Sequence, residues 1–167
     1  VGHAGTLDPL ATGLLIVCTG RMTKQIDSFQ AQEKVYTGTL LLGQTTPTFD
    51  MESEADASYP TDGITIEMME DARKSFIGDI MQKPPKFSAI KINGKRAFDY
   101  ARSDEEIALK ERLIHIDGFK LDYTNFPKVN FEVKCSKGTY IRSLVNDFGK
   151  KLNNGACLIS LRRTMIG

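Results

Sequence analysis

The stretch FKLDYTNFPKVNFEVKCSKGTYIRSLVNDFGKKLNNGACLISLRR, residues 119–163, contains the two periodicities that decide the fold. Its first part, up to residue 135, alternates apolar and polar residues on both sides of Pro127, which predicts two half-buried strands. Its second part predicts a helix over 139–153 and a final strand over 156–163. The helix rests on an apolar stripe with i, i+3, i+4, i+7, i+11 spacing: Ile141, Leu144, Val145, Phe148 and Leu152.

The rest of the chain adds strands and short helices without an internal repeat. The expected strands cover 14–18 and 34–43, and the expected helices cover 22–31 and 66–77. Asn93-Gly94 between two short apolar or basic segments is a strong signal for a two-residue hairpin turn. Because hairpins outnumber parallel crossovers, we expect an α+β fold with a mixed, mostly antiparallel sheet flanked by helices, in one domain over 1–167.

The composition is that of a globular chain, with 167 residues of which 41% are hydrophobic and 26% charged. No apolar run approaches the roughly 18 residues that cross a bilayer, so no membrane association is expected. The three cysteines are scattered and form no C-x-x-C pair, which disfavours a zinc site or a disulfide framework. We therefore expect no metal and a reducing, cytoplasmic location.

The net charge of +1 conceals an uneven distribution along the chain. Residues 50–79 contain nine acids and two bases, and the acidic part over 50–63 is expected to be an exposed loop. Residues 128–163 contain eight bases and two acids. Charge runs usually mark solvated faces, but this basic third could also face a polyanion such as a nucleic acid.

Asp8 is the first residue that suggests chemistry. It lies in GHAGTLDPLATG, residues 2–13, a loop of small residues whose backbone can approach a ligand closely. Pro9 disfavours the helical conformation for the residue before it, so the Asp8 carboxylate should project from an extended turn. A lone Asp-Pro pair is most often only a turn that caps its own backbone.

Four sequence blocks change that balance, because together and in this order they resemble the TruB family, the bacterial-type tRNA uridine-55 pseudouridine synthases. They are GHAGTLDPLATGLLIVCTG from residue 2, KVY at 34–36 followed by LLLGQTT, PPKFSAIKINGKRAFDYAR from residue 84, and CSKGTYIRSLVNDFGKKL from residue 135 followed by LRR at 161–163. Any one block is only suggestive, whereas four in order are highly specific.

The resemblance implies the pseudouridine synthase catalytic fold, incomplete at both ends. The chain would lack the family's N-terminal strand and its C-terminal RNA-binding extension. The implied partner is tRNA, recognised at the T stem-loop, with no obligate protein partner. Isomerisation of uridine to pseudouridine moves the C1′ bond from N1 to C5 of the base without redox change or gain of atoms, so no cofactor is expected.

The resemblance also implies three catalytic residues. Asp8 would be the nucleophilic or acid–base carboxylate, Tyr36 would stack on the extruded uracil, and Arg142 would pair with Asp8. Burial alone raises the pKa of a carboxyl group, and an arginine within ~4–6 Å counteracts that rise. The sequence leaves open whether the carboxylate attacks the sugar or removes a ribose proton.

Five more residues would bind the substrate. Tyr140 and Leu161 would wall the base pocket. His3 would wedge against the T-loop stack beside the flipped nucleotide, and Lys24 and Asp50 would serve the RNA backbone and the pocket edge. Further phosphate contacts would come from a basic set: Lys24, Lys91, Lys95, Arg96, Lys137, Arg162 and Arg163.

Two other functions are compatible with the residues alone. A glycosidic-bond hydrolase would need a second acid or a polarised water beside Asp8 and would release free uracil. A non-catalytic RNA-binding or RNA-folding module would keep its function when Asp8 is replaced by asparagine. Within the family, a guide-RNA-dependent enzyme of the dyskerin type fits the motifs less well than the stand-alone bacterial form.

Overall fold

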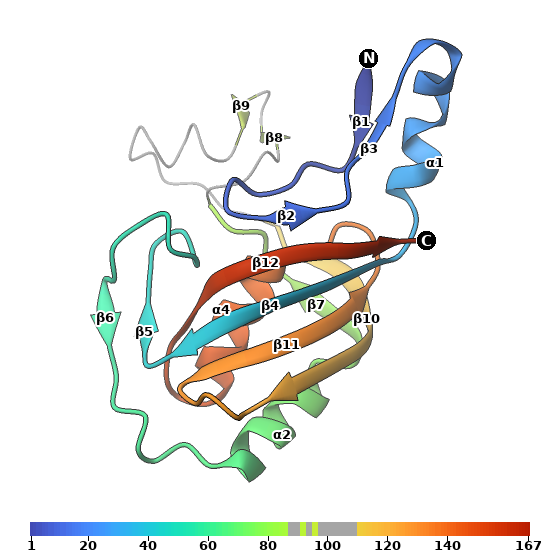
Figure 1. Cartoon of the computed structure of the whole chain (residues 1–167). Helices are drawn as coiled ribbons and strands as arrows, with labels where there is room; N and C mark the ends of the chain where they lie inside the picture. The colour runs from blue at the N-terminus through green and yellow to red at the C-terminus, as the bar shows by residue number, and fades with distance from the viewer. Residues whose placement is uncertain (87–90, 93–94, 97–109) are drawn as a thin grey trace.

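The computed structural model of the chain describes residues 1–86, 91–92, 95–96 and 110–167. Its centre is a six-stranded sheet in the order β2-β12-β4-β11-β10-β7 (Figure 1). Every pairing in this sheet is antiparallel except that of β2 with β12, which is parallel. The strands are β2 Thr12–Gly13, β4 Lys34–Leu42, β7 Gly78–Gln82, β10 Arg112–Asp122, β11 Lys128–Cys135 and β12 Ala156–Ile166.

Two helices, α2 (Ile66–Ser75) and α4 (Ile141–Lys151), cover one face of the sheet and enclose the core (Figure 1). All five residues of the apolar stripe predicted for 139–153 are buried there. The core also takes alternate residues of the strands, such as Val129, Phe131 and Val133 of β11. Helix α4 thus packs its apolar face against the sheet, as the helical spacing predicted.

The N-terminal part forms a smaller unit beside this sheet (Figure 1). Strand β1 (Gly2–Ala4) pairs antiparallel with β3 (Ile16–Cys18), and the chain then continues into η1 (Gly20–Gln25) and α1 (Ile26–Gln30). Between β1 and β3, the loop that carries Asp8 reaches back to the main sheet, where β2 pairs with β12. The loop is therefore anchored to two sheets at once.

The expected α+β fold with a mixed, mostly antiparallel sheet is confirmed, although several boundaries differ. Strand β10 starts at Arg112, well before the alternating residues that revealed it, and α4 starts two residues later than predicted. The predicted turn at 93–94 lies outside the described residues, but β8 (Lys91–Ile92) and β9 (Lys95–Arg96) pair antiparallel on either side of it. A single domain over 1–167 stays a prediction.

The acidic stretch 50–63 was expected to be an exposed loop, and this is wrong for its first residue. Residues 51–63 are mostly exposed and include the short strand β6 (Ala57–Ser58), which pairs with β5 (Gln44–Thr45). Asp50, in contrast, is fully buried next to β12. Among the helices that the structure describes, none is long and apolar enough to cross a membrane.

Candidate active site

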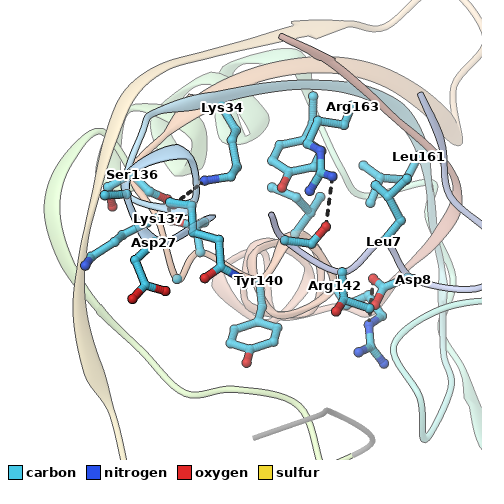
Figure 2. A pocket seen from close by; sticks show the side chains of 18 residues that line it. Leu7, Asp8, Asp27, Lys34, Ser136, Lys137, Tyr140, Arg142, Leu161 and Arg163 are labelled. Atoms are coloured by element: carbon cyan, nitrogen blue, oxygen red, sulfur yellow. Dashed lines mark hydrogen bonds and ion pairs between the residues drawn. The ribbon is translucent and has the colours of Figure 1, made fainter. Parts of the chain in front are cut away.

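A cavity of about 670 Å³ lies where the N-terminal loop, α1, the start of β4, the first turn of α4 and β12 meet (Figure 2). Five of the predicted site residues line it: Asp8, Tyr36, Tyr140, Arg142 and Leu161. They come from four segments that are far apart in the sequence. The sheet and α4 therefore bring together the residues that the sequence blocks had marked separately.

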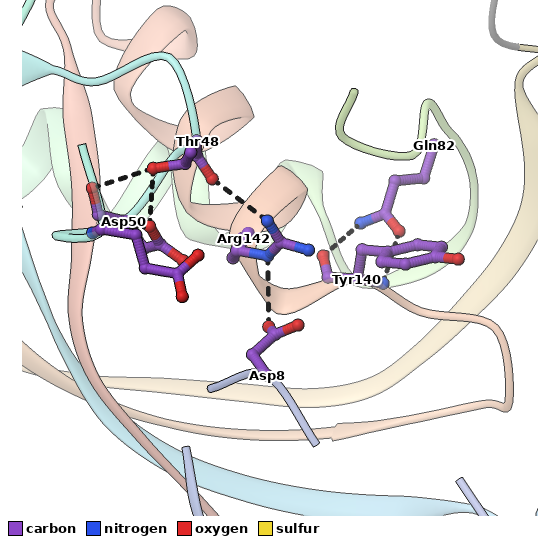
Figure 3. A network of polar contacts seen from close by, with 7 residues as sticks. Asp8, Thr48, Asp50, Gln82, Tyr140 and Arg142 are labelled. Carbon is purple, nitrogen blue, oxygen red and sulfur yellow. Dashed lines mark hydrogen bonds and ion pairs between the residues drawn. The ribbon is translucent and has the colours of Figure 1, made fainter. Parts of the chain in front are cut away.

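Asp8 and Arg142 form an ion pair at the wall of this cavity (Figure 3). The Arg142 Nε donates to Asp8 Oδ2 over 3.1 Å, and the Arg142 Nη1 donates to the backbone oxygen of Thr48 over 3.3 Å. Arg142 lies in the first turn of α4 and is 5% exposed, whereas the Asp8 side chain is 30% exposed. The arginine is thus fixed, and the carboxylate keeps one side open to the cavity.

The Asp8 loop holds its carboxylate out as the Asp-Pro pair predicted. The Asp8 backbone oxygen accepts a hydrogen bond from the amide of Ala11 over 2.8 Å, which closes a tight turn around Pro9. Proline favours the second position of such a turn. The turn leaves the Asp8 side chain free to face Arg142 and the cavity.

The pKa of Asp8 is raised above its ordinary value. Burial is the largest cause, because a desolvated carboxylate is less stable than the neutral acid. The charge and hydrogen bond of Arg142 lower the pKa of Asp8 but do not cancel the effect of burial, and the nearby charge of Asp50 raises it further. The environment therefore makes Asp8 a stronger base than an exposed aspartate.

Asp50 was expected at the pocket edge, but it is fully buried and does not line the cavity; it lies next to Thr48, to one side of Arg142 (Figure 3). Its Oδ1 accepts hydrogen bonds from the Thr48 hydroxyl (2.6 Å) and the Glu52 amide (3.0 Å), and its Oδ2 has no partner among the described residues. Phe49, just before it, has a positive φ of 66°, an uncommon backbone conformation for a bulky residue. Asp50 fixes the turn whose Thr48 oxygen holds Arg142. Nothing in its acidic sequence surroundings signalled this burial.

Tyr36 supplies an aromatic wall. It lies on β4, where it is paired with Val133 of β11 and Arg163 of β12. Burial raises the pKa of the Tyr36 hydroxyl, an effect that the nearby Arg163 guanidinium partly counteracts. The charge of Asp8 contributes to the same rise, which reflects the closeness of the two groups. Tyr36 is therefore a neutral phenol at neutral pH.

Tyr140 and Leu161 complete the lining, and Gln82 holds one of them. Tyr140 is the N-cap residue of α4, with extended backbone angles of φ −99° and ψ 113°. The Gln82 side-chain amide donates to the backbone oxygen of Tyr140 over 3.1 Å, and its side-chain oxygen accepts from the backbone amide of Tyr140 over 2.8 Å (Figure 3). Sequence reasoning did not single out Gln82, which is 2% exposed at the end of β7. It sets the position of the turn that leads into Arg142.

His3 and Lys24 lie outside the cavity lining. His3 is exposed on β1, and Lys24 is exposed in η1. Their exposure is compatible with contact to a macromolecule, but the structure does not bring them to Asp8. Their roles at the RNA stay predictions.

Two buried cations, Lys34 and Arg163, were not expected in the cavity wall (Figure 2). The Lys34 ammonium donates to the backbone oxygens of Gln30 (2.7 Å) and Gln32 (2.8 Å), and burial followed by the charge of Arg163 lowers its pKa. Arg163 was expected among the phosphate contacts, and this is wrong: it is 1% exposed and bonded to backbone oxygens. Its guanidinium group is not available to RNA phosphates.

The described residues contain no group of three histidine, cysteine, aspartate or glutamate side chains arranged to hold a metal ion. The charged and aromatic groups that line the cavity are the carboxylates of Asp8 and Asp27, the guanidinium groups of Arg142 and Arg163, the ammonium groups of Lys34 and Lys137, and the phenols of Tyr36 and Tyr140. Such a set can bind a planar ring and act on it with a base or nucleophile.

Comparison with known proteins agrees with this geometry. The profile of the TruB family pseudouridylate synthase (N terminal domain) matches residues 1–141. The tRNA pseudouridine synthase B of Parabacteroides distasonis is 58% identical over the whole of this chain, which spans 71% of that protein. That of Phocaeicola vulgatus is 55% identical over the same span, again 71% of its length.

A solved structure also has this fold. One chain of a crystallised Cbf5–Nop10–Gar1 complex superposes with a TM-score of 0.72 at 27% identity. The match covers 99% of the present chain and 40% of that chain. Sequence and fold agree, and the chain belongs to the TruB family of pseudouridylate synthases, which are isomerases.

Proposed function

We propose that this chain converts the uridine at position 55 in the T loop of tRNA into pseudouridine, with Asp8 as the catalytic carboxylate. The observation that carries the proposal is the cavity in which Asp8, paired with Arg142, faces the same space as Tyr36 and Tyr140. Relatives that match the whole chain are named tRNA pseudouridine synthase B, which supports tRNA as the substrate.

The geometry suits a nucleotide turned out of its helix. A cavity of about 670 Å³ has room for a base with its ribose. Flipping a base costs on the order of a few kcal/mol, and stacking on an aromatic side chain returns ~1–3 kcal/mol. Tyr36 can therefore offset much of the cost of flipping while the ribose lies toward Asp8.

The carboxylate then acts on the sugar or on a ribose proton. Arg142 favours the ionised form of Asp8, and burial makes that form more reactive than a solvated carboxylate. Tyr36 stays neutral next to the base, because burial raises the pKa of its hydroxyl. No step in this scheme requires a metal or a cofactor.

The rest of the RNA would contact exposed basic side chains around the cavity mouth. Lys137 lines the cavity and is exposed, and Lys24 and Arg162 are exposed on neighbouring elements. Contacts of this kind position the backbone without reading sequence and make affinity fall with salt. We place the activity in the cytoplasm, with tRNA as the partner and no obligate protein subunit.

The proposal is tested by incubating an unmodified tRNA transcript with the protein and mapping pseudouridine at nucleotide resolution. The expected result is one modified nucleotide, in the T loop, and no free uracil. A second transcript with cytidine at that position should stay unmodified. Release of uracil would establish the hydrolase instead, and binding without either product would establish a non-catalytic RNA-binding module.

A further inference from the structure

The loop that carries Asp8 has little apolar burial of its own. From Gly5 to Leu15 no residue is fully buried, although Leu10 and Ala11 pack partly against the core. Segments with few buried apolar contacts open more easily than the core around them. The position of Asp8 must therefore depend on the polar contacts of the loop.

Most of the polar contacts at the two ends of this loop go to one residue, Arg163. Its Nε donates to the backbone oxygen of Leu14 over 2.9 Å, and its Nη2 donates to that of Gly5 over 3.0 Å. Its own backbone oxygen accepts from the Leu14 amide over 2.9 Å. Gly5 precedes Asp8 and Leu14 follows it, so a single side chain binds both ends of the loop.

The loop is shaped to fit against this arginine. Gly13 is paired with Arg163 in the β2–β12 register, and a Cβ atom at Gly13 would lie 2.1 Å from the Arg163 oxygen. Gly5 has a φ of +96°, and a Cβ there would lie 3.3 Å from Arg163 Nη1. Both glycines thus permit a close approach that a side chain would prevent.

Arg163 also lies beside the aromatic wall. It is paired with Tyr36 across β12 and β4, and it is close enough to the Tyr36 hydroxyl to lower the pKa of that group. One buried side chain, 1% exposed, therefore binds the loop that presents the carboxylate and lies next to the residue whose ring faces the base. A planar guanidinium with a fixed fork of donors suits several simultaneous contacts, whereas a lysine has one flexible ammonium group.

We infer that Arg163 is a positioning residue that sets the distance between Asp8 and the base stacked on Tyr36. This inference rests on the proposed function. It predicts that loss of the guanidinium moves the loop without weakening tRNA binding. A misplacement of about 1 Å at a reacting group can lower the rate on the order of 100-fold.

The test uses Arg163→Met, with Arg112→Met as the matched control on the exposed surface of β10. For Arg163→Met we expect kcat to fall on the order of 100-fold, with KM and tRNA affinity close to wild type. Amide hydrogen exchange should become faster over residues 5–14 and stay unchanged in α4 and β11. Arg163→Lys should recover part of kcat and part of the protection. Wild-type kcat in Arg163→Met, or unchanged exchange of the loop, would overturn the inference.

If Arg163→Met does not fold, Gly13→Ala decides, because it displaces the loop from Arg163 and leaves the buried guanidinium in place. Faster loop exchange together with a lower kcat supports the inference, and either of them without the other contradicts it. Failure of the proposed function is distinguishable, because wild type itself would then make no pseudouridine. In that case the exchange of the loop in Arg163→Met alone decides whether Arg163 holds it.

Discussion

On one side of the cavity Asp8 meets Arg142 across 3.1 Å, and on the other Lys34 and Arg163 donate to backbone oxygens. The Asp8 carboxylate is 30% exposed and its pKa is raised, whereas Arg163 is 1% exposed and bonded to two carbonyls. The first group is desolvated yet still reachable, as a reactive group must be. The Arg163 guanidinium instead donates through Nε and Nη2 to backbone oxygens, as expected of a group that holds the fold together. The buried charge on the first side thus suits the proposed catalytic role of Asp8, and the buried charge on the second side binds backbone of the Asp8 loop and of the segment before β4.

The largest expected effect comes from Asp8→Asn, which keeps the volume of the side chain and removes its charge. We expect pseudouridine formation to fall on the order of 1,000-fold or more, because neither a nucleophile nor a base remains at the sugar. The tRNA dissociation constant should change by less than about 3-fold, since phosphate contacts dominate affinity. Single-turnover assays and filter binding on the same tRNA measure the two quantities. Retained turnover would remove Asp8 from the reaction.

Arg142→Met comes next, and its effect depends on pH. Arg142 lowers the pKa of Asp8, so its removal raises that pKa and protonates the carboxylate at a higher pH. We expect kcat/KM to drop ~100-fold at neutral pH and its acid limb to move to higher pH. A pH–rate profile measures the shift, with Arg112→Met as the control. An acid limb at the wild-type pH would show that the pair does not control Asp8.

Tyr36 tests the aromatic wall with a smaller effect. Tyr36→Leu removes the stacking surface, and a loss of ~1–3 kcal/mol corresponds to a fall of about 5- to 150-fold in kcat/KM. Tyr36→Phe keeps the ring and loses only the hydroxyl group, so it should retain more activity than Tyr36→Leu. Equal activities of the two variants would argue against stacking on this ring.

The smallest effect is expected on the supporting side, at Gln82. Gln82→Met removes the two hydrogen bonds that the buried Gln82 side chain makes with the backbone amide and oxygen of Tyr140. We expect the free energy of unfolding to fall by ~1–3 kcal/mol, measured by urea denaturation. Gln25→Met, at an exposed position of η1, is the control and should leave it unchanged. Equal stability of the two variants would mean that Gln82 does not hold Tyr140.

Local patterns in the sequence predicted most of the fold. The alternation over 119–135 and the apolar stripe in α4 each mark one face of a strand or helix, and the apolar residues of both patterns are largely buried in the structure. The start of β10 and the parallel pairing of β2 escaped prediction, since strand ends and partners depend on contacts distant in sequence. The residue types alone carried no information on those contacts.

Site residues that lie in a recognisable motif could be predicted from the sequence. Residues whose burial and hydrogen bonds depend on segments distant in the chain could not. The four sequence blocks led to Asp8, Tyr36 and Arg142, which the structure brings to one cavity. Arg163 was predicted to contact phosphates, because its burial appears only when β12 lies between β4 and the Asp8 loop. Asp50 looked like part of an acidic loop for the same reason.

The central claim is that a nucleotide leaves its helix and enters the cavity between Asp8 and Tyr36. The most direct measurement is a crystal structure of the Asp8→Asn protein bound to a T stem-loop hairpin. The account predicts the target uracil stacked on the Tyr36 ring, with its ribose C1′ beside the side chain at position 8. A target base still stacked within the RNA loop, with the cavity free of nucleotide, would contradict it.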